Sequence, residues 1–190
     1  MKKIVAGVDE VGRGSLIGPV FAAAVILGPK IDKKKLKDSK KLSKKNREIM
    51  YTCIKRSCIW AIGSASIKEI EKHNILNASL LAMKRAIIKL KKKPHLVLVD
   101  GNKLPTIDNY NLKNMIKGDQ KIPEISAASI IAKVSRDRLV SRISKKFKKY
   151  LWNKNFGYGT KDHIQAIKKF GITKYHRKTF QPAHNILSPR

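Results

Sequence analysis

The stretch Ile4-Val-Ala-Gly-Val-Asp-Glu-Val-Gly-Arg-Gly14 predicts a buried β-strand that ends in a pair of acids. Its apolar part, Ile4 to Val8, changes abruptly to Asp9 and Glu10, and the interior of a strand does not readily bury charge. Open α/β folds bind their ligands at the carboxyl ends of the strands. Because successive strand side chains face opposite ways, Asp9 and Glu10 can share a site only if the strand ends there and the backbone turns.

The glycines that follow favour a ligand site over the alternative, an ordinary charged turn after a core strand. Gly12 and Gly14 allow positive φ and a close approach of the backbone to a ligand. Arg13 between them carries a rigid fork of donors that suits phosphate. Acids beside backbone amides and an arginine indicate metal-assisted phosphodiester chemistry.

The pattern of strand, acid and glycine returns at His95 to Val99, which is followed by Asp100 and Gly101. A helix capped by Asn77 precedes it, and Pro94 ends that helix. A crossover helix predicts a parallel strand, placed by the right-handed rule. If this strand neighbours the first, Asp100 emerges at the same end of the sheet as Asp9. The helix has apolar residues at three- and four-residue spacing: Leu80, Met83, Ile87 and Leu90.

Three further apolar runs complete the expected sheet. The run Val20 to Leu27 follows the first strand after a short connection, which favours antiparallel pairing. Ser57 to Ala65 predicts a third strand, so that the first three form a meander. Leu112 to Ile116 predicts a short strand that delivers Gly118 and Asp119 in a turn.

Helices account for most of the rest. One is expected from Ser43, as its cap, to about Arg56. A long helix is expected over residues 126–151, and a shorter one over 161–170 with Thr160 as its cap. Gly171 ends the shorter helix, and the residues after it, to Arg190, are polar and are expected to be loosely ordered.

The composition points to a polyanionic partner. The 190 residues include 43 Lys and Arg but 13 Asp and Glu, a net charge of +30. Neutralised phosphates release counterions, so such a chain favours nucleic acid, although an anionic membrane or plain solvation are alternatives. No apolar run approaches the ~20 residues that span a bilayer, and the N-terminus does not resemble a signal peptide. Cys53 and Cys58 are interpreted as small apolar core residues.

The strand-end positions supply four carboxylates: Asp9, Glu10, Asp100 and Asp119. Hard oxygen ligands in this number suit Mg²⁺ or Mn²⁺. Without a metal, clustering would be unfavourable, because like charges raise each other's pKa. Asp137 is a rival for the fourth place, but it stands mid-helix between two arginines, where a structural ion pair is the commoner role.

The chain resembles the ribonuclease HII family, the type 2 ribonucleases H, in motifs that run in the family's order over nearly its whole length. The motifs are Asp9-Glu-Val-Gly-Arg-Gly14 with Gly18-Pro-Val20, Asp38-Ser-Lys-Lys-Leu42, Val99-Asp-Gly101, Lys117-Gly-Asp119, Ser126-Ala-Ala-Ser-Ile-Ile-Ala-Lys133, Gly157-Tyr158 and His176-Arg177.

The resemblance implies an α/β protein with the ribonuclease H-like fold: a mixed central sheet flanked by helices, with a small helical C-terminal part. The expected division is a catalytic domain over residues 1–151 and a helical extension over 152–190 packed on it. The implied protein is a cytoplasmic monomer that contacts no membrane.

The implied activity is that of a metal-dependent endoribonuclease. It hydrolyses the RNA strand of RNA–DNA hybrids and cuts at ribonucleotides embedded in duplex DNA. The family's catalytic and metal-binding carboxylates correspond to Asp9, Glu10, Asp100 and Asp119, with Mn²⁺ or Mg²⁺ as cofactor. Two ions would activate water and stabilise the leaving oxygen, leaving a 5′-phosphate and a 3′-hydroxyl.

Substrate contacts are expected from two motifs. The family uses the loop Gly12-Arg13-Gly14 on the ribonucleotide that precedes a deoxyribonucleotide, and Tyr158 corresponds to a tyrosine that packs on the sugar at the junction. The alternative for Tyr158 is a core or hinge aromatic. Phosphate contacts are expected from Ser39, Lys40 and Lys41, for which a solvated surface position is the alternative.

Two other functions remain open at this stage. A non-catalytic basic nucleic-acid-binding protein would explain the charge but not the strand-end acids. A different metal nuclease of the same fold class, such as a junction resolvase, would explain the acids but not the glycine–arginine loop. The five histidines show no ligand spacing and are assigned no catalytic role; they are His73, His95, His163, His176 and His184.

Overall fold

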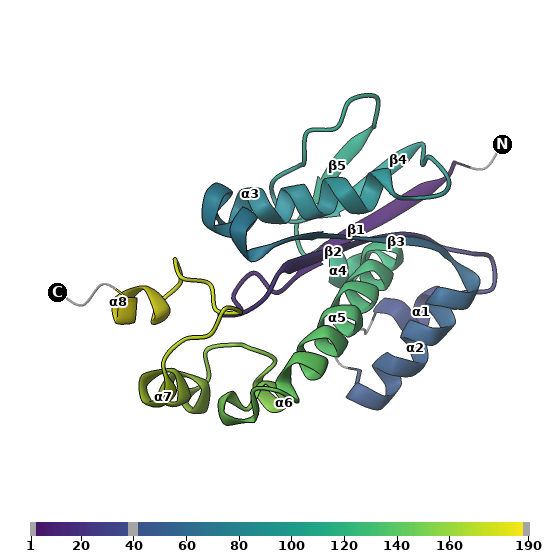
Figure 1. Cartoon of the computed structure of the whole chain (residues 1–190). Helices are drawn as coiled ribbons and strands as arrows, with labels where there is room; N and C mark the ends of the chain where they lie inside the picture. The colour runs from purple at the N-terminus through teal and green to yellow at the C-terminus, as the bar shows by residue number, and fades with distance from the viewer. Residues whose placement is uncertain (1–2, 38–41, 188–190) are drawn as a thin grey trace.

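A computed structural model of the chain describes residues 3–37 and 42–187. Within these ranges the strands form one five-stranded sheet in the order β3-β2-β1-β4-β5 (Figure 1). The strands are β1 (Val5–Val11), β2 (Val20–Ile26), β3 (Ile59–Ala65), β4 (Leu96–Asp100) and β5 (Leu112–Met115).

The pairing of the strands confirms the predicted topology. β1 runs antiparallel to β2, which runs antiparallel to β3, so the meander is as expected. β4 lies parallel to β1, with Val5 opposite Leu96 and Val8 opposite Val99. β5 extends the sheet in parallel beyond β4. The carboxyl ends of β1, β4 and β5 therefore lie at one edge.

Helices cover both faces of this mixed sheet. One core cluster joins one face to α3, through residues such as Ala82 and Met83. The other joins the opposite face to α5 and α2, through residues such as Ile54 and Ile131. Figure 1 shows α3 on one side of the sheet and α1, α2 and α5 on the other. These helices are α1 (Lys33–Lys37), α2 (Lys44–Ser57), α3 (Ile67–Ile88) and α5 (Pro123–Ser144).

The start of α5 lies directly against β1 at Gly7. A Cβ atom at this position would lie 2.1 Å from the carbonyl carbon of Glu124, a distance that no side chain tolerates. The missing side chain lets the helix cross the strand at van der Waals distance and brings its next turns to the edge where β1 ends.

Local signals placed several helix ends correctly and others wrongly. Ser43 caps α2 by accepting from the N–H of Asn46, as predicted. The helix predicted from Asn77 begins instead at Ser66, with a capping box to Glu69, and is interrupted at Asn74, which has φ 63°. The helix predicted over 126–151 starts at Pro123, because proline fits the first helical turn, and ends at Ser144.

The C-terminal part contains the 3₁₀ helix η2 (Lys148–Tyr150), α6 (Trp152–Asn155), α7 (Lys161–Phe170) and α8 (Ala183–Leu187). The described residues after Gly171 were expected to be loosely ordered, but Tyr175, His176 and Arg177 are packed against the rest of the protein. Thr160 caps α7 as predicted. A third core cluster joins Trp152 and Ile167 to Leu16 and Ile17, which follow the glycine–arginine loop. None of the helices in the described ranges is long and apolar enough to cross a membrane.

Two buried histidines stand among the aromatic rings of this cluster. His163 Nε2 accepts from the indole N–H of Trp152 at 2.8 Å, and its Nδ1 lies 3.0 Å from Tyr158 O. His176 Nδ1 accepts from the N–H of Thr173 at 2.8 Å. His176 is 1% exposed, and burial, followed by the charge of His163, lowers its pKa to about 4.

This environment predicts a loss of stability in acid. The unfolded chain protonates His176 below pH 6.5, whereas the folded protein does so only near pH 4. Between these values the unfolded state binds more protons than the folded state. The free energy of unfolding therefore decreases as the pH is lowered from 6.5 to 4, by about 3 kcal/mol in total for this residue. His176→Asn, which keeps an acceptor near Nδ1, should remove this dependence. Denaturant titrations at pH 7, 5.5 and 4 would measure it, and parallel curves for the two proteins would contradict the prediction.

Candidate active site

The first two acids lie within β1 and not after it, which corrects the expected strand end. β1 continues to Val11, so that Asp9 pairs with Ala23 and Glu10 with Ala22 on β2. On the other side, β4 ends at Asp100, one residue beyond its last pairing with β1. The acids are therefore brought to an open edge because their parallel neighbour stops, while their own strand goes on.

The other two acids are positioned by the turn after β5. The N–H of Gly118 donates to Asp100 Oδ1 at 2.7 Å. Asp119 follows in α4 (Gly118–Lys121), a short helix where a turn was predicted, and is 3% exposed. Ser126 Oγ of α5 donates to the backbone oxygen of Asp119, which ties the turn to that helix.

The carboxylates at this edge influence each other's charge. The pKa of Asp9 is raised well above its ordinary value, first by burial and then by the charges of Glu10 and Asp100. The pKa of Glu10 is raised as well, mainly by burial and in part by Asp100, while Arg13 opposes the shift. A buried carboxylate beside two partly buried ones forms a site that a cation would stabilise.

The donor chemistry of the site fits a hard divalent cation, although the side chains do not form a closed cage. Across residues 3–37 and 42–187, no three His, Cys, Asp or Glu lie close enough together to hold a metal ion as a group. Mg²⁺ usually keeps several waters and takes one or two carboxylates plus substrate oxygens. Carboxylates that crowd one another at an open sheet edge, and so raise the pKa of Asp9 and Glu10, match this mode of binding better than that of a structural metal.

Ser129 of α5 is a site residue that the sequence analysis did not assign. Its side chain bonds to the carboxylate of Asp9 and opposes the rise in that pKa. Ser126, Ser129, Lys133 and Arg136 follow at three- and four-residue spacing, so they share one face of the helix. Ser129 belongs to the motif Ser126 to Lys133, but the sequence of an apolar helix does not indicate which residue a serine in it contacts.

The glycine–arginine loop lies next to the acids. Arg13 Nη1 is 3.3 Å from Glu10 Oε1, and its side chain is 49% exposed. Gly12 has φ 92°, and a Cβ atom there would lie 2.3 Å from Arg136 Nε. Both the backbone conformation and the space beneath it therefore require glycine at this position.

Tyr158 lies across from this loop. Ser15 forms an isolated antiparallel bridge with Tyr158, and the N–H of Leu16 donates to Gly157 O at 2.8 Å. The ring of Tyr158 lies 5.5 Å from Lys133 Nζ and 5.6 Å from Arg136 Cζ. The structure thus brings the loop of Gly12, Arg13 and Gly14 close to Tyr158, and their role as substrate contacts stays a prediction.

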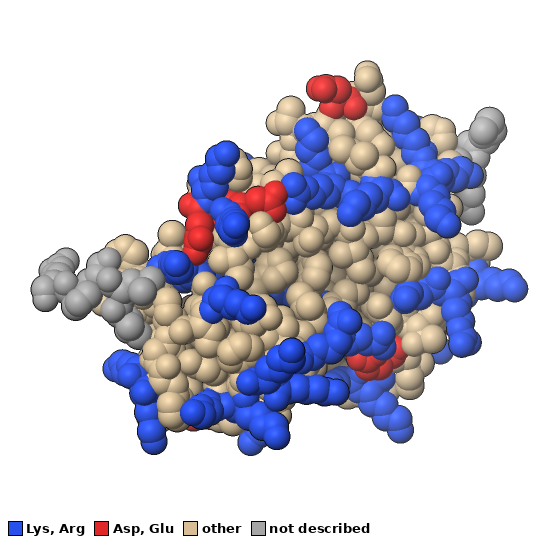
Figure 2. Space-filling model, viewed as in Figure 1, with Lys and Arg blue, Asp and Glu red and all other residues tan. Residues whose placement is uncertain are grey.

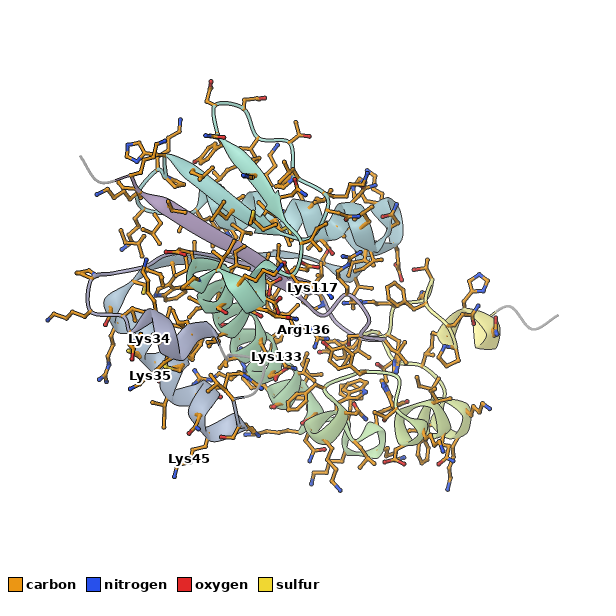
Figure 3. The ribbon with its side chains drawn as sticks, turned by 180° about the vertical axis from the view of Figure 1, so that it is seen from behind. Lys34, Lys35, Lys45, Lys117, Lys133 and Arg136 are labelled. Carbon is orange, nitrogen blue, oxygen red and sulfur yellow. The ribbon has the colours of Figure 1, made fainter. Side chains whose placement is uncertain are left out.

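Basic side chains are common on the surface and also lie near the site. Figure 2 shows Lys and Arg scattered on one face around a large area of other residues, with few acids among them. From behind, Lys117, Lys133 and Arg136 lie near one another, while Lys34, Lys35 and Lys45 lie toward α1 and α2 (Figure 3). The predicted phosphate contacts Ser39, Lys40 and Lys41 lie outside the described residues.

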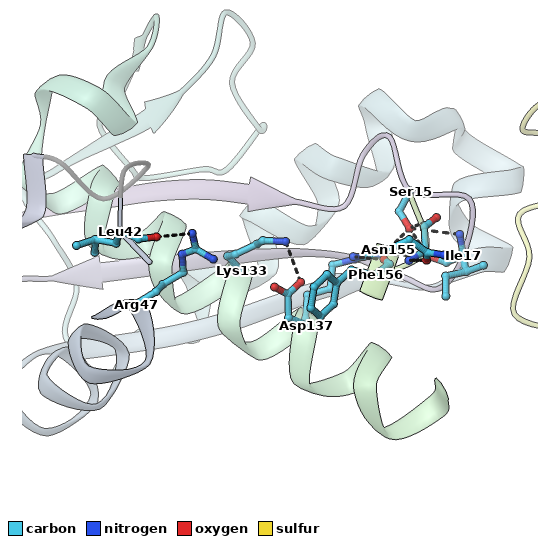
Figure 4. Close-up of polar contacts among 10 residues, drawn as sticks. Ser15, Ile17, Leu42, Arg47, Lys133, Asp137, Asn155 and Phe156 are labelled. Carbon is cyan, nitrogen blue, oxygen red and sulfur yellow. Dashed lines mark hydrogen bonds and ion pairs between the residues drawn. The ribbon is translucent and has the colours of Figure 1, made fainter. Parts of the chain in front are cut away.

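Asp137 forms a structural ion pair, the role favoured from the sequence, but its partner is a lysine and neither of the flanking arginines. Its Oδ1 lies 2.9 Å from Lys133 Nζ, one helical turn earlier (Figure 4). Of the flanking arginines, Arg138 pairs with Glu48 and Arg136 is buried against the glycine loop. This pairing favours Asp119 over Asp137 as the fourth carboxylate.

A mixed sheet in this strand order, flanked by helices and with acids at the carboxyl edge of its parallel strands, has the ribonuclease H-like fold. The model of the family Ribonuclease HII matches residues 6–183, and the chain belongs to that family, whose members are metal-dependent hydrolases.

Individual relatives agree with this assignment. The Ribonuclease HII of Pelagibacter ubique (strain HTCC1062) is 70% identical over 97% of this chain and 100% of its own. The structure of the ribonuclease H2 from Pyrococcus horikoshii OT3 has a TM-score of 0.80, with 26% identity and 96% of each chain covered. Bst-RNase HIII, solved in complex with Mn²⁺, matches with a TM-score of 0.74 over 97% of this chain and 69% of its own; at 16% identity it shows the fold alone.

Proposed function

We propose that the protein hydrolyses the RNA strand of RNA–DNA hybrids and also cuts at ribonucleotides embedded in duplex DNA. One observation supports this most strongly: the clustered acids Asp9, Glu10 and Asp100 lie beside a loop that is bridged to Tyr158. The acids supply a place for phosphodiester cleavage. The loop and the tyrosine supply a place to distinguish the sugar at which it occurs.

Asp9, Glu10, Asp100 and Asp119 would hold Mg²⁺ or Mn²⁺ ions. Two such ions, when bound, activate the attacking water and neutralise charge on the leaving oxygen, leaving a 5′-phosphate and a 3′-hydroxyl. Ser129 orients the carboxylate of Asp9, and the Gly118 N–H orients that of Asp100. The protein's own part is positioning and charge, as phosphoryl transfer generally requires.

Recognition of RNA depends on the 2′-hydroxyl, the group that distinguishes the two nucleic acids locally. Gly14 is exposed, and a Cβ atom there would meet nothing within 4 Å, so a sugar can approach its backbone closely. The ring of Tyr158 lies on the facing loop and would pack on the sugar of the next nucleotide. Lys117 and Lys133 would contact phosphates on either side.

The proposal also covers the localisation, the oligomeric state and the domain division of the chain. The chain would act as a cytoplasmic monomer, with a catalytic domain over residues 1–151 and a helical extension over 152–190. Ser39, Lys40 and Lys41 would contact the duplex backbone, and binding would weaken as the salt concentration rises.

The test uses three duplexes: one of all DNA, one of DNA with a single ribonucleotide, and one long RNA–DNA hybrid. With Mg²⁺ or Mn²⁺ we expect cleavage of the last two alone, and none in EDTA. Cleavage of the all-DNA duplex would indicate a resolvase-like nuclease. Binding without cleavage of any duplex would indicate a non-catalytic binding protein.

Tyr158→Ala should impair cleavage at a single embedded ribonucleotide by roughly tenfold or more, since base or sugar stacking on an aromatic ring is worth about 1–3 kcal/mol. Cleavage inside a long hybrid should fall less, because there the nucleotide that follows the cut is another ribonucleotide and not a deoxyribonucleotide. Rates on both substrates under single-turnover conditions measure the difference. Equal losses would mean that Tyr158 is a structural aromatic.

A further inference from the structure

Arg136 is a buried cation that joins the glycine loop to the Tyr158 loop. It is 0% exposed. Its Nη2 donates to Ser15 Oγ at 2.6 Å and to Ile17 O at 3.1 Å, and its Nη1 donates to Phe156 O at 3.2 Å. Figure 4 shows Ser15, Ile17 and Phe156 gathered at one place. One guanidinium thus holds both sides of the bridge between the loops.

Arg177 holds the same glycine loop from the C-terminal segment. It is also 0% exposed. Its Nε donates to Gly18 O at 2.9 Å and its Nη1 to Arg13 O at 2.8 Å. Its backbone N–H donates to Leu16 O at 2.9 Å. The carbonyl groups along this irregular loop are therefore drawn inward by a residue more than 150 positions away in the chain.

Neither guanidinium forms an ion pair with a carboxylate in the described part of the chain. A buried charge without an opposite partner is destabilising. Burial, followed by the charge of Arg136, lowers the pKa of Arg177 to about 9. Two buried guanidinium groups that form no ion pair with a carboxylate should lower the stability of the core. Stability alone therefore does not explain why both groups hold the glycine loop.

The geometry of the peptide unit supplies one. In a planar trans peptide the C=O of one residue and the N–H of the next point in opposite directions. The C=O of Arg13 points inward to Arg177, so the N–H of Gly14 points outward. Gly14 is exposed and faces open space. Arg177 thus sets the direction of an amide donor at the place where the proposed function puts the ribonucleotide.

We infer that Arg136 and Arg177 are positioning residues that fix the Gly14 amide and the Tyr158 ring in the arrangement that recognises a ribonucleotide. This inference rests on the proposed function. The arginines do not touch the substrate. Arg177 orients the glycine loop, and Arg136 fixes the distance between that loop and Tyr158. Selectivity for a single ribonucleotide in DNA should depend on both.

The test compares Arg136→Lys and Arg177→Lys with the wild-type protein. Lysine keeps the charge, but one ammonium cannot reach the separated acceptors that a planar guanidinium joins. We expect the ratio of cleavage at a single ribonucleotide to cleavage in a long hybrid to fall about tenfold in each variant. Hybrid binding should persist, because the surface lysines are unchanged. A general loss of folded protein would lower both rates together and leave the ratio unchanged.

Arg85→Lys is the matched control. Arg85 donates to Ser64 O at 2.8 Å and pairs with Glu69 at 2.6 Å, on the face of the sheet that α3 covers. Its replacement should lower the melting temperature without changing the ratio. Ser15→Ala provides a second variant, because it removes one acceptor of Arg136 and leaves both cations in place. It should lower the ratio about threefold, and it decides the matter if the arginine variants do not fold.

The outcomes separate the two proposals. If the wild-type protein cleaves neither substrate, the proposed function fails. If it cleaves both, and the ratio is unchanged in the arginine variants or, where these do not fold, in Ser15→Ala, the positioning role is wrong. A ratio that falls in these variants but not in Arg85→Lys supports the inference.

Discussion

Asp9→Asn should lower the rate of hybrid cleavage by roughly a thousandfold or more while the protein stays folded. Asp9 is 6% exposed and lies among acids whose charges raise its pKa. Asparagine has nearly the same shape, so packing against β2 and α5 is kept. Removal of one charge relieves repulsion in the metal-free protein, and the melting temperature should stay the same or rise.

The loss can be traced to the metal site without measuring cleavage. Mg²⁺ or Mn²⁺ should raise the melting temperature of the wild-type protein by mass action, and this rise should shrink in Asp9→Asn. Asp108→Asn, at an exposed loop position, is the control and should behave as wild type in both assays. Full activity in Asp9→Asn, or an undiminished metal-induced rise, would remove Asp9 from the metal site.

The sequence allowed the edge of the sheet to be predicted, because each parallel strand carries its own signal. A run of apolar residues followed by an acid and a glycine can be recognised locally at Asp9 and at Asp100. The exact end of β1 could not be predicted, because β1 continues past the acids to Val11 through its pairing with β2, which no local signal shows. Likewise, Asn74 interrupts α3 with a positive φ, and no neighbouring residue in the sequence predicts this interruption.

The supports of the site were harder to predict, because they are long-range contacts of ordinary residue types. Arg136 stands in the polar run Ser135-Arg-Asp-Arg138 and resembles a surface arginine, yet its guanidinium reaches Ser15, 121 positions earlier. His176 and Arg177 were noted only through the family resemblance, with no chemical role. The structure gives them roles in the aromatic cluster and beneath the glycine loop.

The choice between the two candidates for the fourth carboxylate rests on their surroundings. Asp119 is 3% exposed, in the turn that is also bonded to Asp100. Asp137 lies on α5, and its pair with Lys133 leaves the two side chains 17% and 29% exposed. Such a partly exposed pair contributes about 1 kcal/mol to stability.

Asp119→Asn should therefore lower the cleavage rate by roughly a hundredfold or more, with little change in melting temperature. Asp137→Asn should lower the free energy of unfolding by about 1 kcal/mol and leave the rate within a few-fold of wild type. Lys133→Met is the matched variant for Asp137: if the pair is the reason for its stability effect, the double variant should be no less stable than Lys133→Met alone. Rates and melting curves in Mg²⁺ for the three single variants, the double variant and the wild-type protein measure these effects. A near-wild-type rate in Asp119→Asn, together with a lost rate and unchanged stability in Asp137→Asn, would reverse the assignment and place the fourth ligand on α5.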